Sequence, residues 1–222
     1  RWLPGNEVRA IVVDRQGTAL FATDKGLAGI ERREMTLAAK AAQYEGEVER
    51  YIKRTPYGYL SEVGLGAPGD RSQITYSDSD NDGLWTAMYG AGECYAYAAT
   101  KDPAARQRAK NAFEAMRYLS LAPRGGSHPA PKGFIARTIV PIDEPDPNQR
   151  PGYTLKGQEE SRQRGDKLWR IYEPRWPTSA DGKYYWKSDT SSDELDGHYY
   201  FYALYYDLVA DSDEERELVR EI

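Results

Sequence analysis

Two long helical stretches joined by a short break at Lys101-Asp102 constrain the fold of this chain more than any other feature. The second stretch begins at Pro103, a residue favoured in the first helical turn, and Asp102 is a typical helix cap. Its predicted buried stripe follows the helical period and consists of Ala105, Ala109, Ala112, Phe113, Met116 and Leu119. The first stretch runs from near Asp82 to Lys101, with a predicted apolar face of Leu84, Met88, Tyr95 and Ala99. So short a connection predicts an antiparallel helical hairpin.

Further helical stretches make the expected fold mainly α. One begins near Met35 and ends before Pro56, with a stripe of Leu37, Ala41, Tyr44, Val48 and Tyr51. Another covers residues 192–210, and a last one begins at Asp213 and reaches the end of the chain.

The segments between these helices differ in character. Residues 56–78 are rich in glycine and predict a loop. Residues 122–188 are rich in proline, glycine and charge, with one strand-like run over residues 134–140. Because this long segment also carries many tryptophan and tyrosine residues, we expect an ordered functional loop rather than disorder.

The beginning of the chain follows a β pattern. Residues 8–13 form a β-rich run, the turn 14–17 follows, and residues 19–23 form a second run that Gly26 closes. The chain begins at Arg1, which is not a natural start, so we expect a piece of a longer protein.

Composition excludes some classes of partner. The net charge of −5 argues against nucleic acid, whose phosphates need a basic surface. No apolar run is long enough to cross a membrane. The single cysteine, Cys94, has small neighbours and is expected in the core. The chain holds 18 Tyr and 5 Trp against 4 Phe, an excess of aromatic residues with polar edges that suits sugar-binding clefts.

Two resemblances follow from these patterns. Leu3, Pro4, Asn6, Val8, Ile11, Asp14, Gly17, Thr23, Gly26 and Leu27 resemble one blade of the two-component-regulator β-propellers. The segments SDNDGLWTAMYGAGECYAYAATKDPAARQRAKNAFEAM, GFIAR and KSDTSSDELDGHYYFYALYYDLVA resemble the (α/α) toroids of polysaccharide lyases and glycoside hydrolases.

These resemblances imply a blade remnant over residues 1–32 and a partial (α/α) toroid of antiparallel helical hairpins over residues 33–222. They imply a bacterial carbohydrate-active protein, secreted or periplasmic, whose partner is an acidic polysaccharide or oligosaccharide. No cofactor is expected, and the sequence leaves the oligomeric state open.

The first candidate constellation is the acidic run Asp78-Ser79-Asp80-Asn81-Asp82 before the first hairpin helix. A helix cap with acidic residues favoured by the helix dipole is one interpretation. Since capping needs one such residue, a substrate-binding or catalytic role for one member of the run is the other. A calcium loop is an alternative, although Tyr89 stands where an EF-hand loop needs glutamate. On the helix itself, a stripe of candidate substrate-binding residues continues through Trp85, Tyr89 and Glu93. A hydrogen-bonded core glutamate is the alternative for Glu93.

The second constellation opens the helix at residue 192. Ser191 and Glu194 fit a capping box, which leaves Asp189, Asp193 and His198 for function. Glu194, His198, Tyr202 and Tyr205 share one predicted face. His198 is a candidate catalytic residue or a structural histidine, and scattered acids around one histidine do not predict a metal site.

Arg137, in an apolar run, needs an anionic partner, either a nearby carboxylate or a substrate carboxylate.

Two reactions are compatible with these candidate residues. In uronate β-elimination, Arg137 or Asn81 neutralises the carboxylate, His198 is the base and Tyr199 or Tyr89 the acid. In glycoside hydrolysis, Asp82 pairs with Asp193 or Glu194. The predicted site therefore has Asp82, Asp193, His198 and Tyr199 as catalytic residues. Its predicted binding residues are Asp80, Asn81, Trp85, Tyr89, Glu93, Arg137, Trp186 and Asp189. A non-catalytic glycan-binding module is the remaining alternative.

Overall fold

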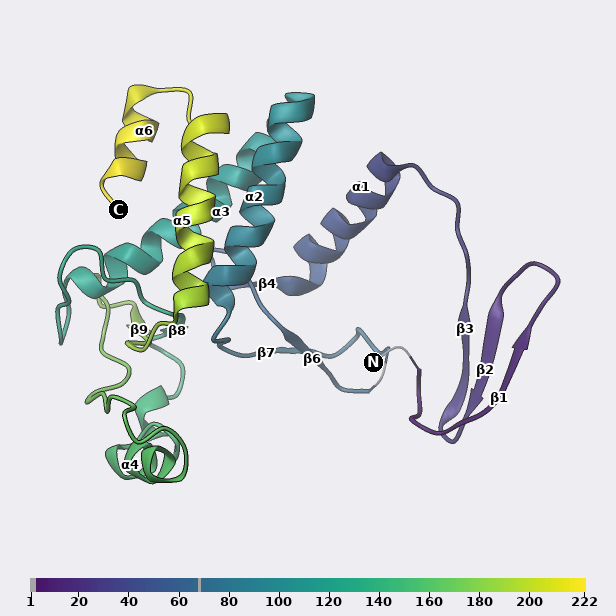
Figure 1. Ribbon diagram of the computed structural model, residues 1–222, viewed down its shortest axis with the longest axis horizontal. Helices are drawn as coiled ribbons and strands as arrows, with labels where there is room; N and C mark the ends of the chain where they lie inside the picture. Colours follow the sequence, from purple (N-terminus) through teal and green to yellow (C-terminus); the bar gives the residue numbers. More distant parts are fainter. Residues whose placement is uncertain (1–2, 68) are drawn as a thin grey trace. The chain divides into compact units, whose positions relative to one another are not determined.

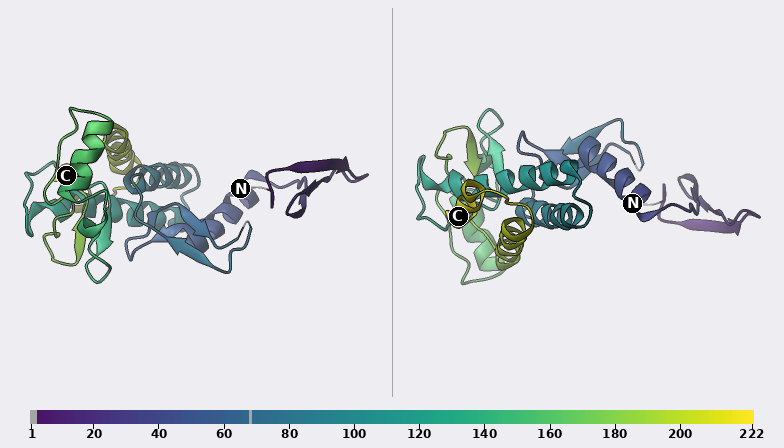
Figure 2. Two further views of the ribbon diagram at one scale, coloured as in Figure 1. Left: turned by 90° about the horizontal axis from the view of Figure 1, so that it is seen from below. Right: turned by 90° about the horizontal axis from the view of Figure 1, so that it is seen from above.

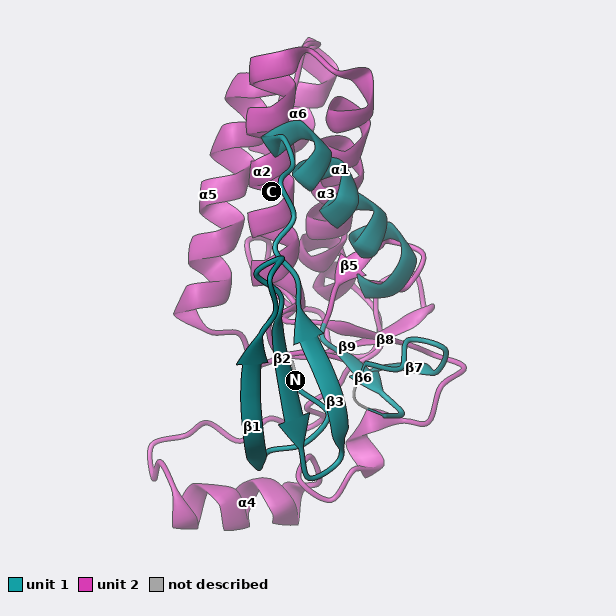
Figure 3. Cartoon of the chain, turned by 90° about the vertical axis from the view of Figure 1, so that its right-hand side faces the viewer, with its two compact units in different colours: residues 1–52, 62–77 teal, residues 53–61, 78–222 magenta. Residues whose placement is uncertain are grey.

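The computed structural model describes residues 3–67 and 69–222. These residues form two compact units, one of residues 1–52 and 62–77 and one of residues 53–61 and 78–222 (Figure 3). These unit boundaries differ from the division expected at residue 32. That division follows from the resemblance of residues 1–32 to a propeller blade, which stays a prediction.

The first unit contains a three-stranded antiparallel sheet, a helix and a short strand pair. Strands β1 (Val8–Val13), β2 (Ala19–Thr23) and β3 (Gly26–Ile30) follow one another in the sheet, as Figure 1 shows. Strands β1 and β2 were predicted. Strand β3 was not, because Gly26, with which it begins, was interpreted as the end of the β segment. The predicted helix is confirmed as α1 (Leu37–Glu47), which continues as a π-helical turn (Val48–Ile52). The turn was not predicted, and the stripe residues Leu37 and Tyr44 are exposed.

The loop predicted over residues 56–78 contains strands instead of irregular chain alone. In the first unit, β6 (Val63–Leu65) pairs with β7 (Ile74–Tyr76). In the second unit, β4 (Lys53–Arg54) pairs with β5 (Tyr59–Leu60) in a tight hairpin. Both pairs are too short for a periodic pattern to show in the sequence.

Three helices form the core of the second unit: α2 (Asp82–Thr100), α3 (Pro103–Leu121) and α5 (Ser192–Leu208). Helix α2 packs against α3 and α5, as Figures 1 and 2 show from three directions. The Asp102 carboxylate caps α3 by accepting from the Ala104 backbone N–H, and the whole predicted stripe of α3 is buried. The helical hairpin and its cap are confirmed.

The buried face of α2 differs from the predicted one. Met88 and Tyr95 are exposed, whereas the small residues Gly83, Ala87, Gly90, Ala91 and Cys94 are buried. Small side chains let the neighbouring helices approach closely, and a Cβ on Gly90 would lie 2.4 Å from the ring of Phe201. Close packing therefore selects the small face over the aromatic one. The prediction that Cys94 is a core residue is confirmed.

The long segment between α3 and α5 is ordered. It holds α4 (Leu155–Arg164), the paired strands β8 (Ile139–Pro141) and β9 (Tyr184–Trp186), and two 3₁₀ turns (Ala122–Arg124 and Pro147–Gln149). The strand predicted over residues 134–140 is wrong in its bounds, since only β8 is regular. Helix α6 (Asp213–Arg220) follows α5 as predicted.

The structure is mainly helical with small antiparallel sheets, and among residues 3–67 and 69–222 there is no closed barrel or propeller. None of the helices in these residues is both long and apolar enough to span a lipid bilayer.

Candidate functional site

The N-terminal ends of α2 and α5 meet beside the β8–β9 pair (Figure 1). Most of the predicted site residues belong to these ends or to the segments that lead into them. The Leu84 backbone N–H donates to Glu194 Oε2 at 2.9 Å, which joins the two helix ends directly. The Arg137 Nε donates to the Asp80 carbonyl at 2.8 Å and joins the entry to α2 with the entry to β8. Segments far apart in the sequence thus form one polar region.

Asp82 is fully buried in this region and forms an ion pair with Arg54. Thr138 donates a hydrogen bond to the same carboxylate oxygen, and Arg54 also donates to the Ile139 carbonyl at 2.9 Å. Burial raises the pKa of Asp82, while the charge of Arg54 and these hydrogen bonds oppose the rise. Asp82 therefore ties β4, α2 and β8 together. Sequence reasoning missed Arg54, because it stands in a short charged run that carries no motif.

Glu194 and His198 lie one helical turn apart on α5 and face Gly83 of α2. A Cβ on Gly83 would lie 2.4 Å from Glu194 Oε2 and 3.0 Å from His198 Nε2. Both side chains are buried, and within residues 3–67 and 69–222 neither Glu194 Oε1 nor His198 Nε2 has a hydrogen-bond partner.

Burial sets the protonation of both groups. It raises the pKa of Glu194 to about 8, against the opposing hydrogen bond from Leu84, and lowers the pKa of His198 to about 3. The Tyr202 hydroxyl donates to the Met116 carbonyl at 3.2 Å and lies 2.7 Å from His198 Nδ1. With the Tyr202 hydroxyl donating to Met116, His198 carries its proton on Nδ1 and Nε2 is the unprotonated nitrogen; with the hydroxyl donating to Nδ1, the proton lies on Nε2. A substrate would reach Nε2 only if α2 and α5 separated.

A second group of charges surrounds Asp189 and is called the Asp189 cluster: Asp80, Arg137, Arg175, Lys187 and Asp189. Arg175 holds Asp189 with two hydrogen bonds of 2.9 and 2.7 Å. Lys187 is buried, donates to Asp80 and lies 3.7 Å from Asp189, and Arg137 lies 3.9 Å from Asp189.

The Asp189 cluster carries more positive than negative charge, since three cations face two carboxylates. Burial raises the pKa of Asp80, but the hydrogen bond and charge of Lys187 outweigh it and the pKa is lowered overall. The five side chains of the cluster therefore have a formal charge of one unit positive. Arg137 also interacts with the exposed carboxylate of Asp193 at the edge of the cluster.

Aromatic rings adjoin these cations. The Tyr153 ring centre lies 4.7 Å from the Arg175 guanidinium and 5.4 Å from Lys187 Nζ, and Trp169 lies 5.7 Å from the same guanidinium. A hollow of about 290 Å³ is lined by Trp169 and Arg175. Another, of about 610 Å³, is lined by Tyr172, Trp186 and Ser188, among others. Concave surfaces with rings and fixed charges are typical of small-ligand sites.

The structure brings Asp80, Asn81, Asp82, Arg137, Trp186, Asp189, Asp193 and His198 to this end of the helices. Asn81 is the N-cap residue of α2, without a side-chain capping bond. Asp193 is exposed, and its pKa is lowered chiefly by the hydrogen bond from Ser191, with a smaller contribution from Arg137.

Other predicted residues lie elsewhere. Trp85 and Tyr199 are exposed on α2 and α5. Tyr89 lies near Lys53, and Glu93 accepts from Arg108 at 2.8 Å, so the continuous polar stripe predicted from Asp82 divides into two environments.

The predicted capping box of α5 is wrong. Ser191 makes no capping bond and donates instead to Asp193, while Glu194 accepts from the neighbouring helix α2. The tertiary contact between the helices takes precedence over the local one.

The carboxylates of the acidic run face separate cations. Asp78 pairs with Arg150 at 2.7 Å, Asp80 with Lys187, and Asp82 with Arg54. Within the part of the chain that the structure describes, no group of three or more His, Cys, Asp or Glu side chains is placed to hold a metal ion.

Arg175, Lys187 and Tyr153 were missed by the sequence analysis. Lys187 follows the strand-like aromatic run YYW, so the argument that singled out Arg137 applies to it as well. Arg175 and Tyr153 stand in irregular segments without such a signal.

Comparison with protein-family models, with curated proteins and with solved structures finds no match to this chain. The chemistry of the site is therefore argued from its own geometry.

Proposed function

We propose that this chain is part of a secreted or periplasmic carbohydrate-active protein that acts on an acidic polysaccharide by uronate β-elimination. In this proposal the helices of the second unit are part of an (α/α) toroid, and the three-stranded sheet is a propeller blade. The observation that carries the proposal is the excess positive charge of the Asp189 cluster beside aromatic rings.

A uronate carboxylate suits the Asp189 cluster for electrostatic reasons. Arg175 is already paired with Asp189 in bidentate fashion, so Arg137, more distant from Asp189, has the geometry to turn toward an added carboxylate. Tyr153 and Trp169 offer faces for the sugar ring. The bound anion would balance the remaining positive charge.

The elimination divides among groups at the Asp189 cluster. Arg137 neutralises the carboxylate and so makes the C5–H more acidic. A base removes that proton, its electron pair forms the C4–C5 double bond, the C4–O bond breaks, and an acid protonates the leaving oxygen. Tyr153 is a residue type able to transfer these protons and lies beside Arg175 and Lys187. It replaces His198 as the preferred base, because His198 Nε2 faces Gly83.

A product assay tests this reaction. The full chain is incubated with a panel of uronate-containing polysaccharides while ultraviolet absorbance of the unsaturated product and release of reducing ends are measured together. The proposal expects both signals, loss of both in Tyr153→Phe, and retention in Tyr199→Phe, a matched exposed tyrosine on α5. Reducing ends without the absorbance would replace elimination with hydrolysis.

Hydrolysis has one observation in its favour. Glu194 has a pKa of about 8 and so is protonated at neutral pH, as a general acid must be. Its proposed partner Asp82 is, however, buried in an ion pair with Arg54, away from a position where it could activate water.

Binding without catalysis is supported by the enclosure of His198. In that case the Asp189 cluster holds the glycan and no turnover follows. Saturable binding of a uronate polysaccharide with neither absorbance nor reducing ends would favour it.

A further inference from the structure

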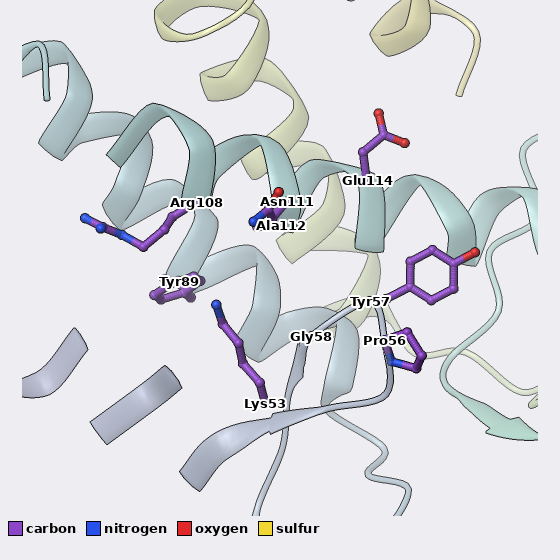
Figure 4. A pocket seen from close by; sticks show the side chains of 9 residues that line it. All are labelled: Lys53, Pro56, Tyr57, Gly58, Tyr89, Arg108, Asn111, Ala112 and Glu114. Atoms are coloured by element: carbon purple, nitrogen blue, oxygen red, sulfur yellow. The ribbon is translucent and has the colours of Figure 1, made fainter. Parts of the chain in front are cut away.

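Another hollow, of about 300 Å³, lies between the β4–β5 hairpin and helices α2 and α3. Figure 4 shows its walls, which belong to the second unit alone. The lining residues are Lys53, Pro56, Tyr57, Gly58, Tyr89, Arg108, Asn111, Ala112 and Glu114. None of them belongs to the Asp189 cluster.

The hairpin that closes the hollow has an unusual backbone. Thr55 has φ = 62°, a left-handed conformation that a β-branched residue rarely adopts, and Gly58 has φ = 73°. The Gly58 N–H donates to the Thr55 carbonyl at 3.0 Å and fixes the turn. Strain of this kind persists where the surrounding structure enforces it, and it is concentrated at functional sites.

Aromatic packing holds the hairpin in place. The Tyr57 ring stacks on Tyr118 with 4.3 Å between centroids, and the Tyr59 hydroxyl donates to the Ala115 carbonyl at 2.6 Å. The Tyr118 hydroxyl is itself anchored on Asp181 at 2.9 Å. The hollow is therefore formed before any ligand enters, which lowers the entropic cost of binding.

Cations and an amide surround the Tyr89 face. Lys53 Nζ lies 5.7 Å from the Tyr89 ring centre, and its side chain points toward that ring in Figure 4. Arg108 is oriented by its bond to Glu93. Asn111 accepts from Gln107 at 2.8 Å on Oδ1, which directs its Nδ2 donor elsewhere. Burial raises the pKa of Tyr57 to about 12, so its hydroxyl remains protonated.

We propose that this hollow binds a carboxylate-bearing sugar unit, with Lys53 and Arg108 facing the carboxylate and Tyr89 the sugar ring. Lys53 and Arg108 outnumber the one carboxylate of the lining, Glu114, which accepts from Arg117 at 3.0 Å, and so favour an anion. The amide donor suits hydroxyl groups, and the ring suits an apolar sugar face. The choice of a sugar acid rests on the proposed function, whereas the preference for a small anion rests on the hollow itself. The hollow would be a binding subsite separate from the Asp189 cluster.

Substitutions that change the charge of the lining, on α3 and on β4, test the proposal without disturbing the core. Asn111→Asp places a negative charge on the hollow and retains the oxygen that accepts from Gln107. Ala104→Asp adds the same charge two turns away, on an exposed residue that does not line the hollow. Lys53→Met removes the cation while keeping the length of the side chain.

Binding is measured on the full chain by ligand-observed NMR and calorimetry, with glucuronate and a short oligouronide as probes. The expected result is a loss of affinity of about tenfold in Asn111→Asp and Lys53→Met, and of less than about twofold in Ala104→Asp. Arg137→Gln should leave this site unchanged while impairing turnover.

Two results would overturn the proposal: no binding of either probe at millimolar concentration, or equal losses in Asn111→Asp and Ala104→Asp. Either result, with turnover still dependent on Arg137, would refute the subsite and leave the proposed function standing. If turnover does not depend on Arg137 while binding still depends on Asn111, the proposed function is refuted and the subsite stands.

Discussion

The α2–α5 interface and the Asp189 cluster both hold buried polar side chains near the same helix ends, but they treat charge in opposite ways. In the interface, burial keeps Glu194 protonated and His198 neutral at neutral pH. In the cluster, Lys187 and Asp189 are equally buried, and each lies against side chains of opposite charge.

This difference distinguishes polar side chains that help to pack the helices from polar side chains that can bind a ligand. The interface has contacts so close that glycine is required at Gly83 and Gly90, which leaves no room for a ligand. Arg175 of the Asp189 cluster lines an open hollow, and the five side chains of the cluster have a formal charge of one unit positive. A histidine and a glutamate on one helix face therefore contribute to packing here, while the arginines and lysine carry the recognition.

The largest loss of stability is expected from breaking the ion pair between Arg54 and Asp82. Arg54→Met leaves the Asp82 carboxylate buried without its partner and should lower the free energy of unfolding by about 3–5 kcal/mol. Chemical denaturation measures this. Arg150→Met is the matched control, since Arg150 is half-exposed and its pair with Asp78 should contribute about 1 kcal/mol or less. Equal losses would mean that the Arg54 pair is not a buried structural element.

A smaller effect tests the close approach of α2 and α5. Gly90→Ala puts a Cβ 2.4 Å from the Phe201 ring and should lower the free energy of unfolding by about 1–3 kcal/mol. Gly92→Ala, on the same helix but in open space, should instead stabilise by roughly 0.5–1 kcal/mol. If both substitutions stabilise the protein in denaturation experiments, the helices are not in tight contact at Gly90.

The opposed pKa shifts of Glu194 and His198 predict a distinctive pH dependence. As pH rises from about 3 to 6.5, the lowered pKa of His198 makes folding more favourable. As pH rises from about 4.5 to 8, the raised pKa of Glu194 makes it less favourable. These contributions to stability offset each other between about pH 4.5 and 6.5. The decrease in stability caused by Glu194 is therefore seen without the His198 contribution between about pH 6.5 and 8.

Glu194→Gln should remove that fall, which denaturation curves across this pH range would detect. A fall of the same size in Glu194→Gln would show that another group is responsible. Asp193→Asn is the control, because Asp193 is exposed on the same helical turn.

The helices were predictable where local signals and packing agree. In α3, the Asp102 cap, Pro103 and a stripe of alanines with Phe113 and Met116 all indicate one helix with one buried face. In α2 the pattern misled, because aromatic residues are exposed and glycines are buried; sequence hydrophobicity does not reveal how closely two helices approach. Helix α4 was missed because its only buried residue is the polar Gln158, which is held by the Tyr153 and Tyr172 carbonyls.

The candidate site was predictable in part for the same reason. Asp80, Arg137 and Asp189 could be singled out because each is a charge next to a structural element. Their meeting depends on the long segment between α3 and α5, whose path has no periodic pattern. Arg175, from that segment, therefore lies in the middle of the Asp189 cluster without a sequence signal.

The most direct test of the central claim compares one uronate polysaccharide with the same polymer after its carboxylates are reduced to alcohols. Affinity for the full chain is measured by calorimetry, with Arg137→Gln and the control Arg220→Gln on α6. If the Asp189 cluster recognises the carboxylate, reduction of the polymer and Arg137→Gln should each weaken binding by about tenfold or more, and Arg220→Gln should not. Equal affinity for the two polymers, or equal losses in the two variants, would contradict the account.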